Sequence, residues 1–325
     1  MRHLLLALAF AAFPVFSQEP PSWFAASLLY LPEDVAEAAK EGKRVMLYFG
    51  QEGCPYCKRL MEVNFRSGPT VQRMRKHFVA LALNIWGDRE ITWTDGKPAT
   101  EKQIALKLKV QYTPTLIFLD EKGGVALRLN GYYPPQRFDA ALDYVAGRME
   151  GKLSFPEYMR DFDRRQPRSE LRSEPFFLPA PLDLRRKPGA RPLAVLFEAP
   201  GCAACDELHD LSFRRDEVLA ELAKFDVVRF SILGGEFFTG IDGKKTTPAG
   251  WAAALKVAHV PTMVLFDSRG REALRMEAYF RPFHLAGSLA YVSSGAYLRE
   301  PSLQRFLQGR ADAQRSRGTR VDLWN

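Results

Sequence analysis

The chain contains four cysteines, and they form two Cys-x-x-Cys pairs: Cys54 with Cys57, and Cys202 with Cys205. Each pair follows an apolar run typical of a buried strand and precedes a helix-forming stretch. Cysteines three residues apart lie side by side on one helical turn, close enough for an internal disulfide. The spacing and its setting therefore predict two centres of dithiol–disulfide exchange.

The start of a helix gives the two thiols of each pair different roles. Unpaired backbone N–H groups and the positive end of the helix dipole stabilise a thiolate there. The first thiol, Cys54 or Cys202, is predicted to be the more exposed of each pair and to act as the nucleophile. The second, Cys57 or Cys205, lies further into the helix and is predicted to resolve the mixed disulfide.

Cys-x-x-Cys motifs also attach haem, bind zinc or form structural disulfides. Haem attachment requires a histidine directly after the second cysteine, where Lys58 and Asp206 stand. A four-cysteine zinc site would have to join motifs 148 residues apart (202 − 54). Two purely structural disulfides would close loops so short that they add little stability. We expect redox-active dithiols with no metal and no cofactor, and the zinc and structural readings remain as alternatives.

A proline follows each dithiol and opens an apolar, strand-like run. Proline at the start of a strand supplies no N–H and often marks an unusual bend, sometimes a cis bond. With this feature the chain resembles the thioredoxin superfamily, in which a cis-proline loop faces the Cys-x-x-Cys motif and receives the substrate strand. The resemblance implies two substrate-binding loops opposite the dithiols, at Thr113, Pro114, Val260 and Pro261.

The two halves of the chain are an internal duplication. The first cysteines differ by 148 positions (202 − 54) and the prolines by 147 (261 − 114), so one net residue separates the copies. A repeat of this length is a duplicated domain, because solenoid units have about 20–50 residues. In each copy strands alternate with helices and end in a hairpin. This order predicts the α/β class, with a mixed β-sheet flanked by helices in each of two tandem thioredoxin-like domains.

Domain boundaries follow from composition and from the expected elements. We expect a signal peptide at 1–17, domain 1 at 22–160, an Arg/Pro-rich linker at 161–190, domain 2 at 191–310 and a basic tail at 311–325. In the first copy, helices are expected near 32–39, 70–77, 100–108 and 135–149, and strands at 44–49 and 79–84. Added helical stretches are expected at 155–162 and 303–309.

The first copy sharpens the resemblance. Gly53 before the dithiol, Pro55 and Tyr56 within it, and Gly131-Tyr132 after the last strand are similar to SoxW-like periplasmic thioredoxin-related proteins. This resemblance implies reduction of protein disulfides with electrons from a membrane thiol transporter. Thioredoxins usually carry a buried aspartate six residues before the first cysteine, and here those positions are Tyr48 and Leu196. Proton transfer to the resolving thiols must therefore use water, another side chain or a different route.

The N-terminus predicts export. Arg2 and His3 precede an apolar run at 4–16, and Ser17 is the expected cleavage site of a secretory signal peptide. The run is too short for a confident membrane span, although an uncleaved anchor is the alternative. Export would place the dithiols in an oxidising compartment, and we expect the periplasm.

The positive charge of the chain does not indicate nucleic-acid binding. The net charge is +8, of which residues 160–191 contribute +4 (9 − 5) and residues 310–325 contribute +2 (4 − 2). Most of the excess therefore lies in the expected linker and tail rather than on a folded face. We expect protein disulfides and dithiols as partners and no nucleic acid.

These features predict a periplasmic thiol–disulfide oxidoreductase that acts on protein disulfides through two sites, and the resemblance implies the reducing direction. The copies differ in the residue before the proline, Thr113 against Val260, and between the cysteines, Tyr56 against Ala203-Ala204, which suggests different potentials. An electron relay between the two dithiols is a further hypothesis. The alternative is a client-binding or chaperone-like module in which at most one dithiol is active.

Overall fold

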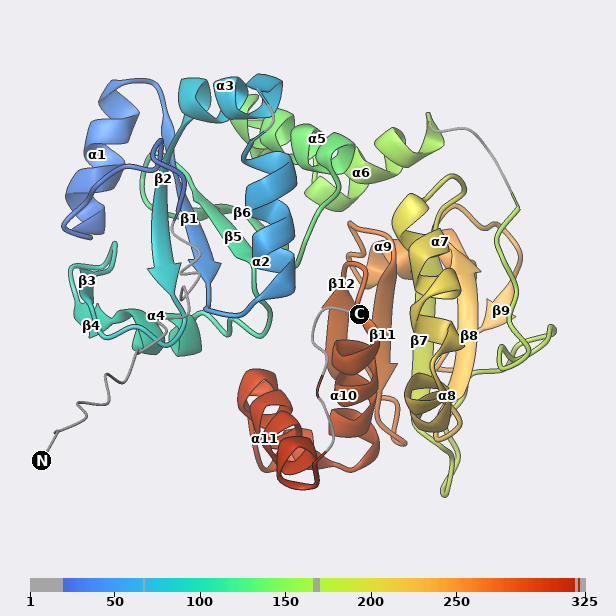
Figure 1. Cartoon of the computed structure of the whole chain (residues 1–325). Helices are drawn as coiled ribbons and strands as arrows, with labels where there is room; N and C mark the ends of the chain where they lie inside the picture. The colour runs from blue at the N-terminus through green and yellow to red at the C-terminus, as the bar shows by residue number, and fades with distance from the viewer. Residues whose placement is uncertain (1–19, 67, 166–169, 319–320, 322–325) are drawn as a thin grey trace, which may run out of the picture.

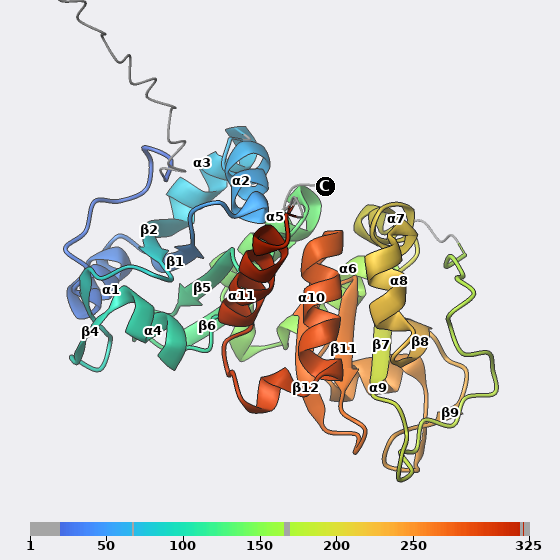
Figure 2. The same cartoon turned by 60° about the horizontal axis from the view of Figure 1, so that its bottom comes forward.

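The computed structural model describes residues 20–66, 68–165, 170–318 and 321. Two domains of the same topology lie side by side, and the C-terminal helices of the second domain lie between the two sheets (Figures 1 and 2). The duplicated α/β architecture expected from the sequence is confirmed.

The first domain is built on a four-stranded mixed sheet. Its strand order is β2 (Phe78–Asn84), β1 (Arg44–Gly50), β5 (Thr115–Leu119) and β6 (Val125–Asn130). Strand β1 runs parallel to β2 and antiparallel to β5, and β6 is antiparallel to β5. Every residue of β1 is buried, because helices cover both faces of the sheet.

Alternating side chains of β1 fill two apolar layers, one on each face of the sheet. Met46 and Tyr48 point to the layer covered by α2 (Pro55–Arg59), α3 (Gly68–His77), α5 (Pro135–Ala146) and α6 (Phe155–Arg164). Val45, Leu47 and Phe49 point to the layer covered by α1 (Leu31–Lys40) and α4 (Glu101–Lys107). A short hairpin, β3 (Glu90–Thr92) and β4 (Pro98–Thr100), precedes α4, and a π-helical turn at Leu60–Asn64 follows α2.

The second domain repeats this plan. Its sheet has the order β8 (Asp226–Ser231), β7 (Leu193–Glu198), β11 (Thr262–Phe266) and β12 (Glu272–Glu277), with the same strand directions. One face carries α7 (Ala203–Asp210), α8 (Asp216–Leu222), α10 (Pro282–Ser293) and α11 (Leu303–Ser316). The other face carries α9 (Pro248–Ala254), beside the small hairpin of β9 (Phe238–Thr239) and β10 (Lys245–Thr246). Short 3-10 turns lie at Met149–Gly151, Ser212–Arg214 and Ala296–Leu298.

Much of the segment between the domains packs against the second one. Phe177 pairs with Val227 and Asp183 with Thr239 through isolated backbone bridges, and the Leu184 side chain is fully buried. The later part of the predicted linker therefore contributes side chains to the core of the second domain. Helix α11 continues past the expected end of the last helix, into the predicted tail.

The predicted signal peptide, residues 1–17, lies outside the described residues. Among the helices that are described, none has the length and apolar character needed to cross a membrane.

One end of the first sheet is tied by an ion pair that should make stability depend on pH. Glu121 accepts hydrogen bonds from Arg44 at 3.0 Å and from Arg148 at 2.7 Å. The Arg44 bond, more than any other contact, lowers the pKa of Glu121 from 4.5 to about 2. Because the folded-state pKa is depressed, the stabilisation is complete above the unfolded value and is lost as the pH falls towards the folded value.

We therefore expect Glu121→Gln to be less stable than the wild type at pH 6, with a difference that narrows below the unfolded pKa of 4.5. Denaturant unfolding of both proteins over a pH series measures this difference. A difference that stays constant down to low pH would contradict the assignment of Glu121 to this ion pair.

Candidate active sites

Both dithiols cap a helix in the same way. Cys54 is the N-cap of α2, and its Sγ accepts a hydrogen bond from the Cys57 backbone N–H at 3.0 Å. Cys202 caps α7, and its Sγ accepts from the Cys205 N–H at 3.1 Å. Each pair forms an internal disulfide, as the spacing predicts. The helix-start geometry that favours a thiolate is therefore present twice, and the nucleophilic and resolving roles stay predictions.

The expected proline loop lies against the first dithiol. The Thr113–Pro114 and Val260–Pro261 peptide bonds are both cis. Cys54 Sγ lies 3.3 Å from the carbonyl oxygen of Thr113, so the loop and the sulfur are in contact. In the second domain, Val260 belongs to the same buried apolar cluster as Cys205. The structure thus brings the first predicted loop into contact with its dithiol.

The two domains pack through equivalent faces. Tyr112 meets Phe280 edge-on with ring centroids 5.4 Å apart, and His259 stacks on Tyr133 at 3.8 Å. These two contacts are copies of each other, because 259 − 112 and 280 − 133 both equal 147. A contact that is repeated with the roles exchanged is the mark of a two-fold, isologous interface. The proline loops of both domains therefore face the partner domain.

The helices that carry the dithiols also meet at this interface. Arg59 in α2 bonds to Glu207 in α7 at 3.2 Å, and these positions are equivalent (207 − 59 = 148). The Arg59 guanidinium also lies over the Tyr132 ring, 5.0 Å from its centroid. Asn130 donates a hydrogen bond of 2.8 Å to Glu277, which is the equivalent position in the second domain (277 − 130 = 147). Polar pairs thus fix the register of one domain against the other.

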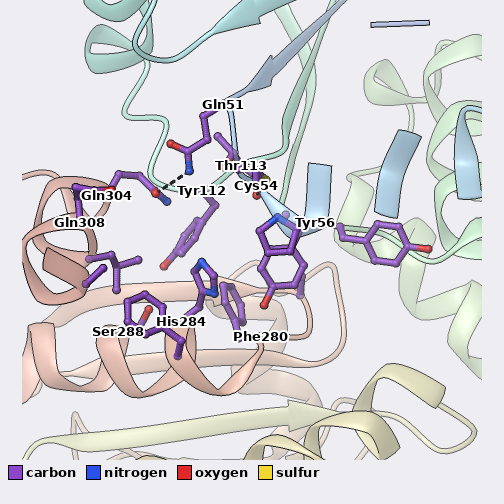
Figure 3. Close-up of a pocket in the computed structure, with 18 of the residues that line it drawn as sticks. Gln51, Cys54, Tyr56, Tyr112, Thr113, Phe280, His284, Ser288, Gln304 and Gln308 are labelled. Atoms are coloured by element: carbon purple, nitrogen blue, oxygen red, sulfur yellow. Dashed lines mark hydrogen bonds between the residues drawn. The ribbon is translucent and has the colours of Figure 1, made fainter. Parts of the chain in front are cut away.

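Cys54 opens into a cavity of about 290 Å³ that lies between the domains. Figure 3 shows its walls: Cys54, Tyr56, Tyr112 and Thr113 from the first domain face a layer of side chains from the second. The Gln51 and Gln304 side chains close one side with a hydrogen bond of 3.2 Å. Cys54 is only 3% exposed, so the second domain controls access to the first dithiol in this arrangement.

A histidine of the second domain forms part of the wall of this cavity. The His284 ring packs on Tyr56 at 5.4 Å, and Tyr56 Oη accepts a hydrogen bond from the Arg281 N–H. Burial, followed by the charge of Arg281, lowers the pKa of His284 to about 4, so the imidazole is neutral at pH 7. Within the described residues, His284 Nδ1 and Ser288 Oγ are buried and make no hydrogen bond. Both residues line the cavity, and no spacing in the sequence indicates this.

A different set of groups surrounds the second dithiol. Cys202, Cys205, Glu198 and His209 line one small cavity of about 20 Å³. His209 Nε2 lies 3.1 Å from Glu198, and its Nδ1 lies 2.8 Å from Glu174. Burial opposes protonation of His209, but the hydrogen bonds to the two carboxylates outweigh it and raise the His209 pKa.

The sequence analysis missed this cluster. One feature of the sequence could have indicated it: Glu198 ends a strand that is otherwise apolar, Leu193–Glu198. Within the described residues, no group of three or more histidine, cysteine or acidic side chains is arranged to hold a metal ion.

Substitutions at the Arg59–Glu207 pair test whether the interface between the domains limits access to Cys54. Arg59→Glu places two carboxylates against each other and is expected to loosen the interface. Alkylation of reduced Cys54 by a bulky maleimide should then be several-fold faster, as measured by mass spectrometry of the labelled peptide. The charge-swapped chain that also carries Glu207→Arg should return to the wild-type rate. Equal rates in all three proteins would show that the interface does not limit access.

The comparisons with known proteins agree with the fold. The family model "Thioredoxin-like domain" matches residues 31–146 and 182–293. No curated protein matches the chain.

Among solved structures, a thioredoxin-fold protein from Helicobacter pylori is 23% identical and covers 42% of this chain and 92% of its own, with a TM-score of 0.34. A thioredoxin from Thermus thermophilus is 28% identical and covers 36% of this chain and 83% of its own, with a TM-score of 0.29. The periplasmic thioredoxin SoxS from Paracoccus pantotrophus is 21% identical and covers 33% of this chain and 98% of its own, with a TM-score of 0.24.

Proposed function

The chain belongs to the thioredoxin-like domain family, with one copy in each half, and on this premise we propose that it is a thiol–disulfide oxidoreductase acting on protein disulfides. The observation that carries the proposal is the contact of 3.3 Å between Cys54 Sγ and the Thr113 carbonyl oxygen. A helix-capping disulfide beside an extended loop is suited to receive a substrate strand next to the reacting sulfur.

In the proposed reaction the reduced Cys54 thiolate attacks one sulfur of a substrate disulfide. A Cys54–substrate disulfide forms, and the other substrate sulfur leaves as a thiolate. Cys57 then attacks Cys54 Sγ, the mixed disulfide breaks, and the substrate leaves fully reduced while Cys54 and Cys57 are oxidised. The N-terminus of α2 stabilises the Cys54 thiolate before attack.

The substrate-binding role is proposed for the two proline loops, Thr113 with Pro114 and Val260 with Pro261. The backbone of the first loop lies beside Cys54, and Val260 shares an apolar cluster with Cys205; both loops are proposed to pair with an extended substrate segment. At the first site, His284 and Ser288 line the cavity, and their Nδ1 and Oγ atoms are buried and make no hydrogen bond in the described part of the chain.

We place this activity in the periplasm and in the reducing direction. The signal-like N-terminus supports export, and in an oxidising compartment reduction requires electrons from a membrane thiol transporter. The second dithiol, Cys202 with Cys205, is proposed either to reduce substrates itself or to pass electrons to the first.

Reduction of insulin disulfides in the presence of dithiothreitol tests the proposal. The wild type should accelerate reduction well above the dithiothreitol background, and the Cys54→Ser/Cys202→Ser double variant should not. If the wild type shows no acceleration but suppresses aggregation of an unfolded client as well as the double variant does, the chain is a client-binding module instead.

A further inference from the structure

We propose that Glu198, oriented by His209, accepts the thiol proton of Cys205 when the second dithiol closes into a disulfide. This inference rests on the proposed function, because only a dithiol that exchanges needs a proton acceptor. It names a group for the second site that has no counterpart at the first.

The position of Glu198 supports this role. Glu198 is the last residue of β7, and its side chain is 1% exposed. It lines the same cavity as both cysteines, and that cavity of about 20 Å³ has room for about one water molecule. A carboxylate that lines this cavity can exchange a proton through that water with a thiol that lines it. Burying a carboxylate is costly unless it has partners, and His209 Nε2 at 3.1 Å supplies one.

His209 is in turn held on its other side. Glu174 lies 2.8 Å from His209 Nδ1, and Arg214 pairs with Glu174 at 2.7 Å. With His209 protonated, these four groups carry two positive and two negative charges. Hydrogen bonds to both carboxylates raise the His209 pKa against the effect of burial, which favours this charge state.

Other charged groups lie around the cluster. Arg172 and Asp210 pair at 2.6 Å, and Glu170 and Asp206 line the cavity together with Arg172. Asp206 and Asp210 are exposed, whereas Glu174, Glu198 and His209 are buried. The buried groups are the ones shielded from bulk water, so a proton placed on Glu198 has its strongest effect on the nearby sulfur.

The proposed step begins with Cys202 in a disulfide with a partner sulfur. The Cys205 S–H bond breaks and its proton moves to Glu198, while the Cys205 thiolate attacks Cys202 Sγ. The Cys202–Cys205 bond forms and the Cys202–partner bond breaks. The partner sulfur leaves as a thiolate with the electron pair, so the partner is reduced and the dithiol is oxidised. The remaining His209 imidazolium offsets the charge of the Cys205 thiolate. In the reverse direction Glu198 returns the proton to Cys205.

The first copy is a natural control. The positions equivalent to Glu198 and His209 are Gly50 (198 − 148) and Met61 (209 − 148), neither of which titrates. The space beside Gly50 is filled by Tyr48, since a Cβ added to Gly50 would lie 2.2 Å from the Tyr48 hydroxyl oxygen. Burial raises the pKa of Tyr48, so that hydroxyl keeps its proton and does not replace the carboxylate.

The test measures closure of each dithiol separately, in full-length chains. One chain carries Cys54→Ser and Cys57→Ser, and the other carries Cys202→Ser and Cys205→Ser. Each reduced protein is mixed with one equivalent of 5,5′-dithiobis(2-nitrobenzoate), so that no reagent is left to react with the resolving thiol. The first released thionitrobenzoate reports the mixed disulfide, and the second reports attack by the resolving thiol.

We expect closure at the first site to rise about tenfold per pH unit below the thiol pKa, because solvent must generate the thiolate. Closure at the second site should be nearly flat from about pH 6 to pH 8, because Glu198 takes the proton within the site. A parallel rise at both sites would overturn the proposal. If neither protein releases a second thionitrobenzoate, the proposed function itself fails.

Two variants test whether Glu198 causes the flat pH profile of closure at the second dithiol. Glu198→Gln keeps the size of the side chain and should slow closure at pH 7 by about 100-fold, with the steep pH profile of the first site. Asp206→Asn removes a carboxylate from the same cavity and should keep the flat profile. A flat profile in Glu198→Gln would overturn the proposal. If Glu198→Gln does not fold, the pH profiles of the two chains that keep Glu198 still test the proposal.

Discussion

Replacing Cys54 with serine is expected to lower the rate of protein-disulfide reduction at the first site by more than about three orders of magnitude. A serine hydroxyl is un-ionised at neutral pH, whereas a thiol at the start of α2 is stabilised as a thiolate by the helix N-terminus. The measurement is insulin reduction in the background that lacks Cys202 and Cys205, so that the second dithiol cannot substitute.

The matched variant is Cys57→Ser in the same background. It keeps the nucleophile but removes the resolving thiol, so it should accumulate a stable mixed disulfide between Cys54 and substrate. Non-reducing electrophoresis should show this adduct with Cys57→Ser and not with Cys54→Ser. If the Cys54→Ser variant instead forms a mixed disulfide through Cys57, then Cys57 is the nucleophile and Cys54 the resolving thiol.

Replacing Arg137 with alanine is expected to lower the free energy of unfolding by about 3–5 kcal/mol at pH 7. Arg137 forms a buried ion pair with Asp163, donates to His259 Nδ1 at 3.2 Å and donates to the Ala258 carbonyl oxygen at 3.3 Å. The substitution leaves a buried carboxylate without its partner and removes two bonds to the second domain. Denaturant unfolding monitored by circular dichroism measures the change.

This loss should depend on pH in a defined direction. Burial already raises the pKa of Asp163 above 3.8 despite the attraction of Arg137. Without Arg137 the pKa of Asp163 should rise further, and a raised folded-state pKa destabilises the fold only above the unfolded value. The difference from the wild type should therefore shrink as the pH falls towards 3.8.

Arg164 offers a control on the same helix as Asp163. Its side chain is 62% exposed and pairs with Asp161 at the surface, at 2.8 Å. Arg164→Ala should change the unfolding free energy by less than about 1 kcal/mol. Equal effects of Arg137→Ala and Arg164→Ala would show that the buried cluster does not stabilise the domain interface.

Local features of the sequence were sufficient to predict most of the fold. The apolar run ending at Phe49 and the glycine-marked turn before Cys54 predict a strand, a turn and a capped helix without knowledge of distant contacts. The constant offset between the halves extends that prediction to the second domain. The proline positions predict two loops, and the structure places the first of them in contact with Cys54.

The sites themselves depend on contacts that no local pattern reveals. His284 reaches the Cys54 cavity from a helix more than two hundred positions away, and Glu174 reaches His209 from the predicted linker. An isolated histidine on a helix has no spacing that distinguishes a site residue from a core residue. The packing of the two domains supplies the His284 contact, and the packing of the linker on the second domain supplies the Glu174 contact. Only the three-dimensional arrangement shows them.

The two sites, although copies, differ in their surroundings. The first dithiol is covered by the partner domain, next to a histidine that stays neutral. The second is half-buried and lies beside a buried cluster of two carboxylates and a histidine. We therefore expect the two dithiols to differ in reduction potential, as the different residues between the cysteines also suggest.

Equilibration of each dithiol against dithiothreitol and glutathione buffers, in a chain where the other pair is replaced by serine, measures whether both dithiols are redox-active. We expect two reversible transitions with different midpoints, both above about −300 mV, where redox-active dithiols lie. Pairs that stay oxidised throughout, with midpoints below about −300 mV, would be structural disulfides and would contradict this expectation.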